Sequence, residues 1–239
     1  MLLQPKYTYK ELPRTNVDGE RRYATPDGNK LPSVTTILEA TKPEEAKEAL
    51  RNWQKQMGAD RARQITTEAA SRGTRMHSYL EHYVKTGTLR DRPTNPFAFA
   101  SYDMANEVIA QGLCKVDRVW GVEAALYYPE IYAGTTDSVG IHTGSEAIMD
   151  YKQSNREKKT EFIGDYFIQL TAYANAHNQL YGTKIRKGVI MMCVKPVEKS
   201  PGVYSTPPKY LEWIIEGSEF DRWSDRWWHR VEQYYMKHM

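Results

Sequence analysis

Apolar residues recur at every third or fourth position through much of the first half of the chain, which is the spacing of one helix face. Ser33 stands where it can cap a short helix, and Gly58 interrupts a long segment rich in helix-forming residues. A further helix is expected to begin at Gly73. The pattern predicts helices over residues 34–38, over 43–72 (two helices), over 73–87 and over 97–112, after a hairpin at residues 21–31.

Beyond residue 112 the pattern changes to short apolar or alternating runs, which are typical of strands. Three consecutive runs, separated by turn residues, predict three antiparallel strands. They are followed by a long helix, a strand that is apolar on both faces, another strand, and a final helix capped by Ser218. The predicted strands cover residues 116–128, 132–139, 147–152, 188–194 and 210–215, and the predicted helices cover 160–180 and 218–234.

This order of elements places the chain in the α+β class, and its 239 residues suit a single domain. We expect residues 1–72 to form an N-terminal hairpin and helical part. Residues 73–195 would form the core, and residues 196–239 a C-terminal strand and helix.

The composition is that of a soluble globular protein, with 40% hydrophobic and 26% charged residues and a net charge of only +3. No stretch approaches the roughly 20 apolar residues that span a bilayer, so no membrane contact is expected. The first residues lack the pattern of a signal or transit peptide. We therefore expect a cytoplasmic protein, of a bacterium or of a phage-infected host cell.

The two cysteines, Cys114 and Cys193, lie far apart in the chain. This count and spacing exclude a disulfide scaffold, a zinc ribbon and a four-cysteine iron-sulfur cluster, and we expect both thiols to be buried. Aromatic residues are more informative than net charge, since the chain holds 17 Tyr and 6 Trp. Rings in such number fit either a core or a surface on which bases stack.

Three charged residues fall together in the predicted strands. Asp150 and Lys152 are two apart, so they point to the same side of their strand. Asp137 belongs to the preceding strand, and an antiparallel hairpin would bring it beside Asp150. Two carboxylates and one ammonium on a sheet face suit a magnesium site for phosphodiester cleavage. The alternative is a pair of strands with solvated charges.

The motif formed by Asp137 and the later Asp150-Tyr151-Lys152 resembles that of the PD-(D/E)XK nuclease superfamily. Gln169 and Tyr173 are similar to the QxxxY element of its RecB-like exonuclease branch. They are four residues apart in a predicted helix, so both can reach the same cleft.

Upstream, residues 72–81 resemble the glycine, histidine and glutamate helix of the same branch. Together with residues 31–38, the pattern is similar to the mitochondrial genome maintenance exonucleases and their phage relatives. The resemblance covers about residues 31–195. It implies a restriction-endonuclease-like core, in which a helix, three antiparallel strands, a helix and a strand follow in order.

The resemblance also implies roles for individual residues. His77, Asp137 and Asp150 would bind Mg²⁺, and Mn²⁺ would be able to take its place. Lys152 would position or activate the hydrolytic water, and Gln169 and Tyr173 would orient the scissile phosphate. Glu81 and Glu123 are additional candidates for the metal site, although each also fits an ordinary polar surface residue.

The resemblance predicts a DNA exonuclease that acts on single strands or ends, in DNA degradation, recombination or repair. A structure- or sequence-specific endonuclease and a non-cleaving nucleic-acid-binding protein are the alternatives. A phosphate loop of the GxxxxGK[ST] type is missing from the sequence, so we expect either a stand-alone nuclease or one that works with a helicase. A single-strand-binding protein is another candidate partner. The basic residues predicted to contact DNA phosphates are Arg72, Arg75, Arg156, Lys158 and Lys159.

Overall fold

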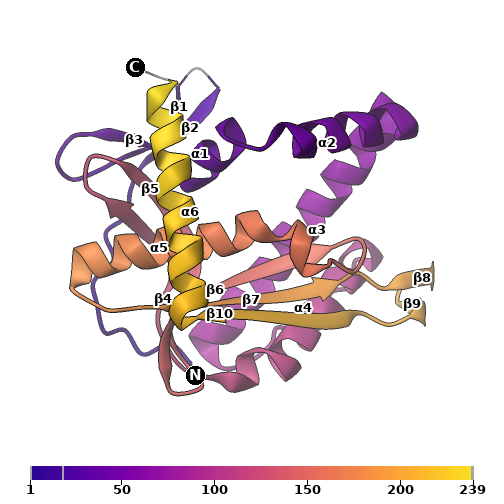
Figure 1. The fold of residues 1–239 in the computed structure, drawn as a ribbon. Coiled ribbons are helices and arrows are strands. Elements are labelled where there is room, and N and C mark those ends of the chain that lie inside the picture. Colours follow the sequence, from indigo (N-terminus) through magenta and orange to yellow (C-terminus); the bar gives the residue numbers. More distant parts are fainter. Residues whose placement is uncertain (1, 18, 238–239) are drawn as a thin grey trace.

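In the computed structural model, which describes residues 2–17 and 19–237, a five-stranded sheet lies between two layers of helices (Figure 1). A three-stranded sheet and three helices precede it. These N-terminal elements are β1 (Arg14–Val17), β2 (Glu20–Ala24), β3 (Lys30–Pro32), α1 (Val34–Ala40), α2 (Glu44–Met57) and α3 (Ala59–Thr86).

The second half of the chain supplies the central sheet and the remaining helices. Short 3₁₀ helices lie at Pro96–Ala98, Leu113–Lys115 and Thr160–Phe162. The other elements are α4 (Phe99–Gln111), β4 (Val116–Tyr128), β5 (Tyr132–His142), β6 (Ser145–Ser154), α5 (Gly164–Tyr181), β7 (Lys187–Val194), β8 (Val197–Ser200), β9 (Val203–Thr206), β10 (Lys209–Glu216) and α6 (Gly217–Met236).

The strands of the central sheet lie in the order β10-β7-β6-β5-β4. β4, β5 and β6 pair antiparallel, as predicted. The chain then crosses over through α5, so β7 pairs parallel to β6, and β10 adds antiparallel to β7. This mixed sheet with helices on both faces confirms the α+β class.

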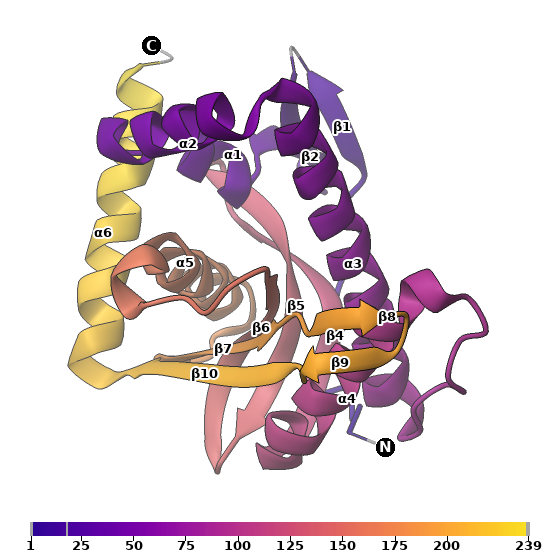
Figure 2. The ribbon, with the colours of Figure 1, turned by 90° about the vertical axis from the view of Figure 1, so that its right-hand side faces the viewer.

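Side chains alternate between the two faces of the sheet and pack into two separate hydrophobic cores. Ile148 and Ile190 face the core formed with α1, α5 and α6, whereas Met149 and Val189 face the core formed with α3 and α4. β7 is buried along its whole length because helices cover both faces, which explains its unbroken apolar run. The two helix layers leave α2 as a projecting arm whose described residues include none that is buried (Figure 2).

Two helix boundaries differ from the sequence prediction. No helix begins at Gly73, because α3 is one helix of 28 residues that carries this glycine in its interior. A helix tolerates one such residue at a cost of about 1 kcal/mol when its other residues are well packed. The break falls only at Gly58, whose φ of 78° turns the chain between α2 and α3. Ser218 is not a cap, since α6 already begins at Gly217.

Aromatic residues contribute much of the core. Trp227, Tyr132 and Tyr234 are among the largest fully buried side chains. A second aromatic group surrounds the buried His177, whose Nε2 lies 3.0 Å from the hydroxyl of Tyr9. Most of the aromatic excess is therefore structural.

The cysteine prediction is half right: Cys193 is buried, but Cys114 is exposed at the end of α4. Three short strands, β1, β8 and β9, were not predicted. β1 and β8 are exposed at every position, so they carry no apolar alternation to indicate them. Among the described residues, no helix combines the length and apolar character needed to cross a membrane.

Candidate metal and catalytic site

The candidate site lies where β5 and β6 separate. Their pairing runs from the turn as far as Ser138 opposite Met149, and the next residues on the two strands are Asp137 and Asp150. The Oδ2 atom of Asp137 accepts a hydrogen bond of 2.7 Å from the backbone N–H of Tyr151. The Asp137 side chain thus replaces a backbone carbonyl of β5 as the hydrogen-bond acceptor for β6. The other carboxylate oxygen stays available at the fork.

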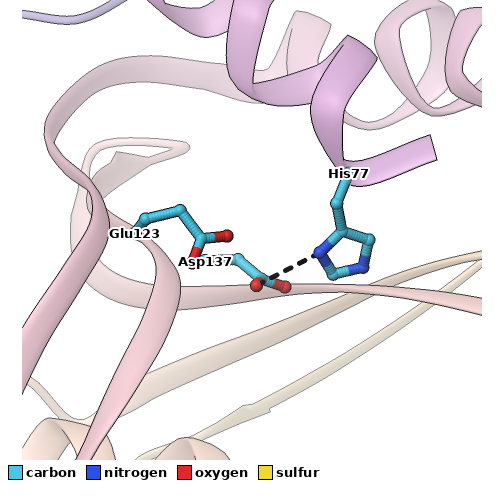
Figure 3. Close-up of side chains that lie close together, drawn as sticks. All are labelled: His77, Glu123 and Asp137. Carbon is cyan, nitrogen blue, oxygen red and sulfur yellow. Dashed lines mark ion pairs between the residues drawn. The ribbon is translucent and has the colours of Figure 1, made fainter. Parts of the chain in front are cut away.

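His77 reaches this fork from α3 (Figure 3). Its Nε2 lies 2.9 Å from the carbonyl oxygen of Tyr151, and its Nδ1 lies 3.4 Å from Oδ1 of Asp137. A carbonyl can only accept a hydrogen bond, so Nε2 carries the proton and a neutral ring would turn its lone pair at Nδ1 toward Asp137. The backbone of β6 therefore orients the imidazole in the manner of a metal ligand.

Charges at the fork shift the pKa values of His77 and Asp137. Burial alone would lower the pKa of His77, but the hydrogen bond and charge of Asp137 outweigh it and raise that pKa. Burial acts in the opposite sense on Asp137, whose pKa is nevertheless lowered, chiefly by His77. In the absence of a cation, the pair thus favours an imidazolium beside a carboxylate.

Glu123 completes a cluster of three ligand-type side chains. It lies on β4 between Val122, opposite Ser138, and Ala124, opposite Thr136, which places it across from Asp137. Ligand atoms of His77, Glu123 and Asp137 all lie within 4.8 Å of one another (Figure 3). Burial, and then the charge of Asp137, raise the pKa of Glu123. Acids held this close favour a cation between them.

The backbone of Glu123 is strained, which supports a functional position. Its φ is 48°, in the left-handed region that non-glycine residues seldom adopt. Such strain costs on the order of 1–3 kcal/mol and gathers at functional sites.

Asp150 and Lys152 form a buried ion pair beside this cluster. Burial raises the pKa of Asp150 to about 6, although the ammonium of Lys152 opposes the shift. Burial alone would lower the pKa of Lys152, but the charges of Asp150 and Asp137 outweigh it and raise that pKa. The ring of Tyr166 covers the same ammonium, with 5.1 Å between Nζ and the ring centroid.

Gln169 and Tyr173 lie on α5, and Nε2 of Gln169 donates a hydrogen bond of 3.2 Å to the hydroxyl of Tyr173. Tyr173 packs against the backbone of β5 at Gly134, where an added Cβ would lie 2.7 Å from its ring. Only glycine permits this approach. The QxxxY pair thus lies against β5. Burial is the main cause of the raised pKa of Tyr173, and the charges of Asp150 and Asp137 add to it.

A cavity of about 750 Å³, here called the inner cavity, adjoins the site. Its walls come from α2, from α3 and from the segment after β6, and Tyr166 links it to Lys152. Three of the residues predicted to contact DNA phosphates line it, Arg72, Arg156 and Lys158, together with Trp53. Phe162 and Tyr166 line it too, so basic and aromatic side chains share one concave surface.

Two of the residues predicted to contact DNA, Arg72 and Arg75, have protein partners, and Lys159 does not line the inner cavity. Arg72 is 9% exposed and donates to the side chains of Gln153 and Asn155, which ties α3 to the end of β6. Arg75 donates to Ser101, and Lys159 is exposed just before a 3₁₀ helix.

Glu81 does not join the metal-type cluster, because its Oε1 accepts from Lys85, 2.6 Å away. Sequence reasoning did not single out Tyr166. A signal existed, since Tyr166, Gln169 and Tyr173 follow at intervals of three and four on one face of α5.

Replacing Glu123 with glycine is expected to weaken metal binding without lowering the stability of the fold. We expect Mn²⁺ affinity to fall by about tenfold or more, because one ligand is lost. The free energy of unfolding should stay unchanged or rise by about 1 kcal/mol, because glycine tolerates the φ of 48°. Calorimetric Mn²⁺ titration and urea unfolding measure the two effects.

The matched control is Glu130→Gly, at an exposed turn position with a φ of 64° outside the cluster. It should relieve the same backbone strain without changing metal affinity. Equal metal affinity in the Glu123 variant and the wild type would remove Glu123 from the site.

Comparison with known proteins gives distant relatives. No family model matches the chain. It is 27% identical over 178 residues to the human protein named mitochondrial genome maintenance exonuclease 1, and the alignment covers 70% of this chain and 50% of that protein. The protein of the same name from Xenopus tropicalis is 26% identical over 211 residues, covering 81% of this chain and 58% of the relative.

The mouse protein of that name is 27% identical over 180 residues, covering 70% of this chain and 51% of the relative. The chain thus spans about half the length of the curated relatives it matches. This distant similarity supports the resemblance to an exonuclease family, whereas the assignment to the PD-(D/E)XK superfamily stays a prediction.

Proposed function

We propose that the chain is a metal-dependent DNA exonuclease of the PD-(D/E)XK type, with a restriction-endonuclease-like core, that hydrolyses phosphodiester bonds of single strands or at DNA ends. The observation that carries the proposal is the sheet fork, where His77, Glu123 and Asp137 gather beside the buried pair of Asp150 and Lys152. The similarity to proteins named genome maintenance exonucleases supports DNA as the substrate. A bacterial or phage setting is proposed from sequence alone, whereas those relatives are named mitochondrial.

The residues at the fork fit a divalent cation. Two carboxylates and one imidazole in a cluster, with Asp150 nearby, suit Mg²⁺ or Mn²⁺. A bound cation would polarise the phosphate and make a water molecule more acidic. Binding would displace the proton at Nδ1 of His77, which now faces Asp137.

The chain's own residues would supply the remaining electrostatics. Lys152 has a raised pKa, so at neutral pH it is an ammonium that donates hydrogen bonds and cannot accept a proton. Its role is therefore to orient the attacking water and to offset charge that develops on the phosphate. Gln169 and Tyr173, which lie one turn apart on α5 and are hydrogen-bonded to each other, would hold the scissile phosphate through their amide and hydroxyl donors.

The inner cavity is the proposed path of the substrate strand. Arg156 and Lys158 would bind phosphates, while the rings of Trp53 and Tyr166 would stack on bases. Stacking requires unpaired bases, which favours a single strand over a duplex.

The proposal is tested with end-labelled linear DNA and closed single-stranded circles. We expect Mg²⁺ to support degradation of the linear strand and EDTA to abolish it, while the circles stay intact. The Mg²⁺ concentration required should rise as the pH is lowered through about 6, because protons then compete for Asp150.

The other outcomes identify the alternatives. Cleavage of the circles would indicate an endonuclease. Binding without products in Mg²⁺ or Mn²⁺ would indicate a non-cleaving nucleic-acid-binding protein.

A further inference from the structure

A second cavity lies at the elbow where α2 turns into α3, and we name it the elbow cavity. Its volume is about 740 Å³, and Arg51, Lys55, Arg63, Thr66 and Thr67 contribute to its walls together with the elbow residue Gly58. This volume falls within the range of ligand pockets. None of the residues that line it also lines the inner cavity.

Helix geometry explains why the same two helices border two cavities. On α3, Arg61, Ile65, Glu68 and Arg72 follow at intervals of four, three and four, so they share the face that lines the inner cavity. Residues 62, 63, 66 and 67 occupy another face and line the elbow cavity. The α2–α3 arm is therefore a partition with a hollow on each of two faces.

The elbow cavity has an excess of positive charge. Three cations line it, and no Asp or Glu is among its lining residues. Arg51 is paired with Glu44 at 3.0 Å, whereas within residues 2–17 and 19–237 neither Lys55 nor Arg63 has an ion-pair partner. Both are exposed. By contrast, the inner cavity includes Glu68 and Glu157 among its lining residues.

In another basic cavity of this fold, acidic residues neutralise the positive charge. It is lined by Lys184, Arg186 and Lys187, but Glu216 and Glu146 line it too. Arg186 is in addition paired with Asp221, and Lys187 lies 3.8 Å from Glu216. The elbow cavity therefore offers the stronger attraction to an anion.

We propose that the elbow cavity binds phosphates of the nucleic-acid strand that continues beyond the inner cavity. Lys55 and Arg63 supply uncompensated charge, and the hydroxyl of Thr67 can donate to a phosphate oxygen. The hydroxyl of Thr66 already donates to the carbonyl oxygen of Ala62. The ligand is a single strand because it must bend around the α2–α3 arm to reach both cavities. Duplex DNA is stiff over about 150 base pairs, so it does not make that bend at low cost.

This inference rests on the proposed function, since it assumes that a strand occupies the inner cavity. The experiment measures the affinity of labelled oligonucleotides of about 5 and about 30 nucleotides by fluorescence anisotropy. The full chain is used with Lys152→Met, so that DNA cleavage is too slow to disturb the binding measurement. The test variant adds Lys55→Ala and Arg63→Ala. The matched control adds Lys47→Ala and Lys85→Ala, which remove the same charge from α2 and α3 outside both cavities.

We expect the test variant to bind the long oligonucleotide about tenfold more weakly, with the slope of log affinity against log salt reduced by about 1.4 for two lost phosphate contacts on a single strand. The short oligonucleotide should bind within about twofold of the parent, because it fills the inner cavity alone. The control should leave both affinities unchanged.

Two results would overturn the inference while leaving the proposed function standing: an unchanged affinity for the long oligonucleotide, or an equal loss for both lengths. Failure of the parent chain to bind either oligonucleotide would instead overturn both proposals.

Discussion

Replacing Lys152 with methionine is expected to slow DNA cleavage by about a thousandfold, because removing one preorganised donor from a water-poor site costs 10²–10³ in rate. Methionine keeps most of the side-chain volume and removes only the charge and its donors. The ammonium is held in place by its ion pair with Asp150 and by the ring of Tyr166. Single-turnover cleavage of end-labelled single-stranded DNA at saturating Mg²⁺ measures the effect.

The same substitution also reports on Asp150. Lys152 opposes the burial that raises the pKa of this carboxyl to about 6, so without the lysine the pKa should rise further. The carboxyl then takes up a proton at a higher pH than in the wild type, which limits the loss of stability to less than the roughly 3–5 kcal/mol expected for an unpaired buried charge. Urea unfolding checks that the variant is folded.

Lys199→Met is the matched control, since Lys199 lies on the exposed strand β8 and belongs neither to the cluster at the fork nor to the lining of the inner cavity. It should cleave DNA at the wild-type rate. Cleavage by the Lys152 variant within about tenfold of the wild type would contradict the role proposed for the ammonium.

The strands of the site were predictable because they obey a local rule. Alternation along β5 and β6 places Asp137, Asp150 and Lys152 in register positions that a hairpin brings together, and the structure has that hairpin. Their chemical roles remain proposals. The α+β class was equally accessible, because each element of the central sheet buries an apolar face that shows in the pattern.

The rest of the site depends on tertiary geometry. Glu123 points to the fork because β4 adopts a positive φ there, next to register shifts that no local pattern reveals. His77 and Glu81 share a helix face by spacing, yet one turn separates them, so only His77 reaches Asp137 while Glu81 pairs with Lys85. The inner cavity joins segments about 100 residues apart, which the spacing of motifs does not indicate.

Asp137→Asn is expected to abolish cleavage and to weaken Mn²⁺ binding by at least about a hundredfold, since even outer-shell substitutions at metal sites cost 10–100-fold. Asp137 is the hub of the fork: one carboxylate oxygen accepts from the N–H of Tyr151, and the other faces Nδ1 of His77. The amide keeps the first contact through its carbonyl oxygen. Its NH₂ group then takes the second place, where it cannot bind a cation.

The fold should survive this substitution, because a neutral His77 can accept from the new amide at Nδ1 while Nε2 keeps its bond to the carbonyl of Tyr151. The pKa of His77 should fall, since Asp137 is what raises it against burial. Calorimetric Mn²⁺ titration and NMR titration of the imidazole measure the two changes. Asp225→Asn, an exposed acid on α6, is the control and should change neither. Mn²⁺ affinity within about fivefold of the wild type would mean that the fork is not where the metal binds.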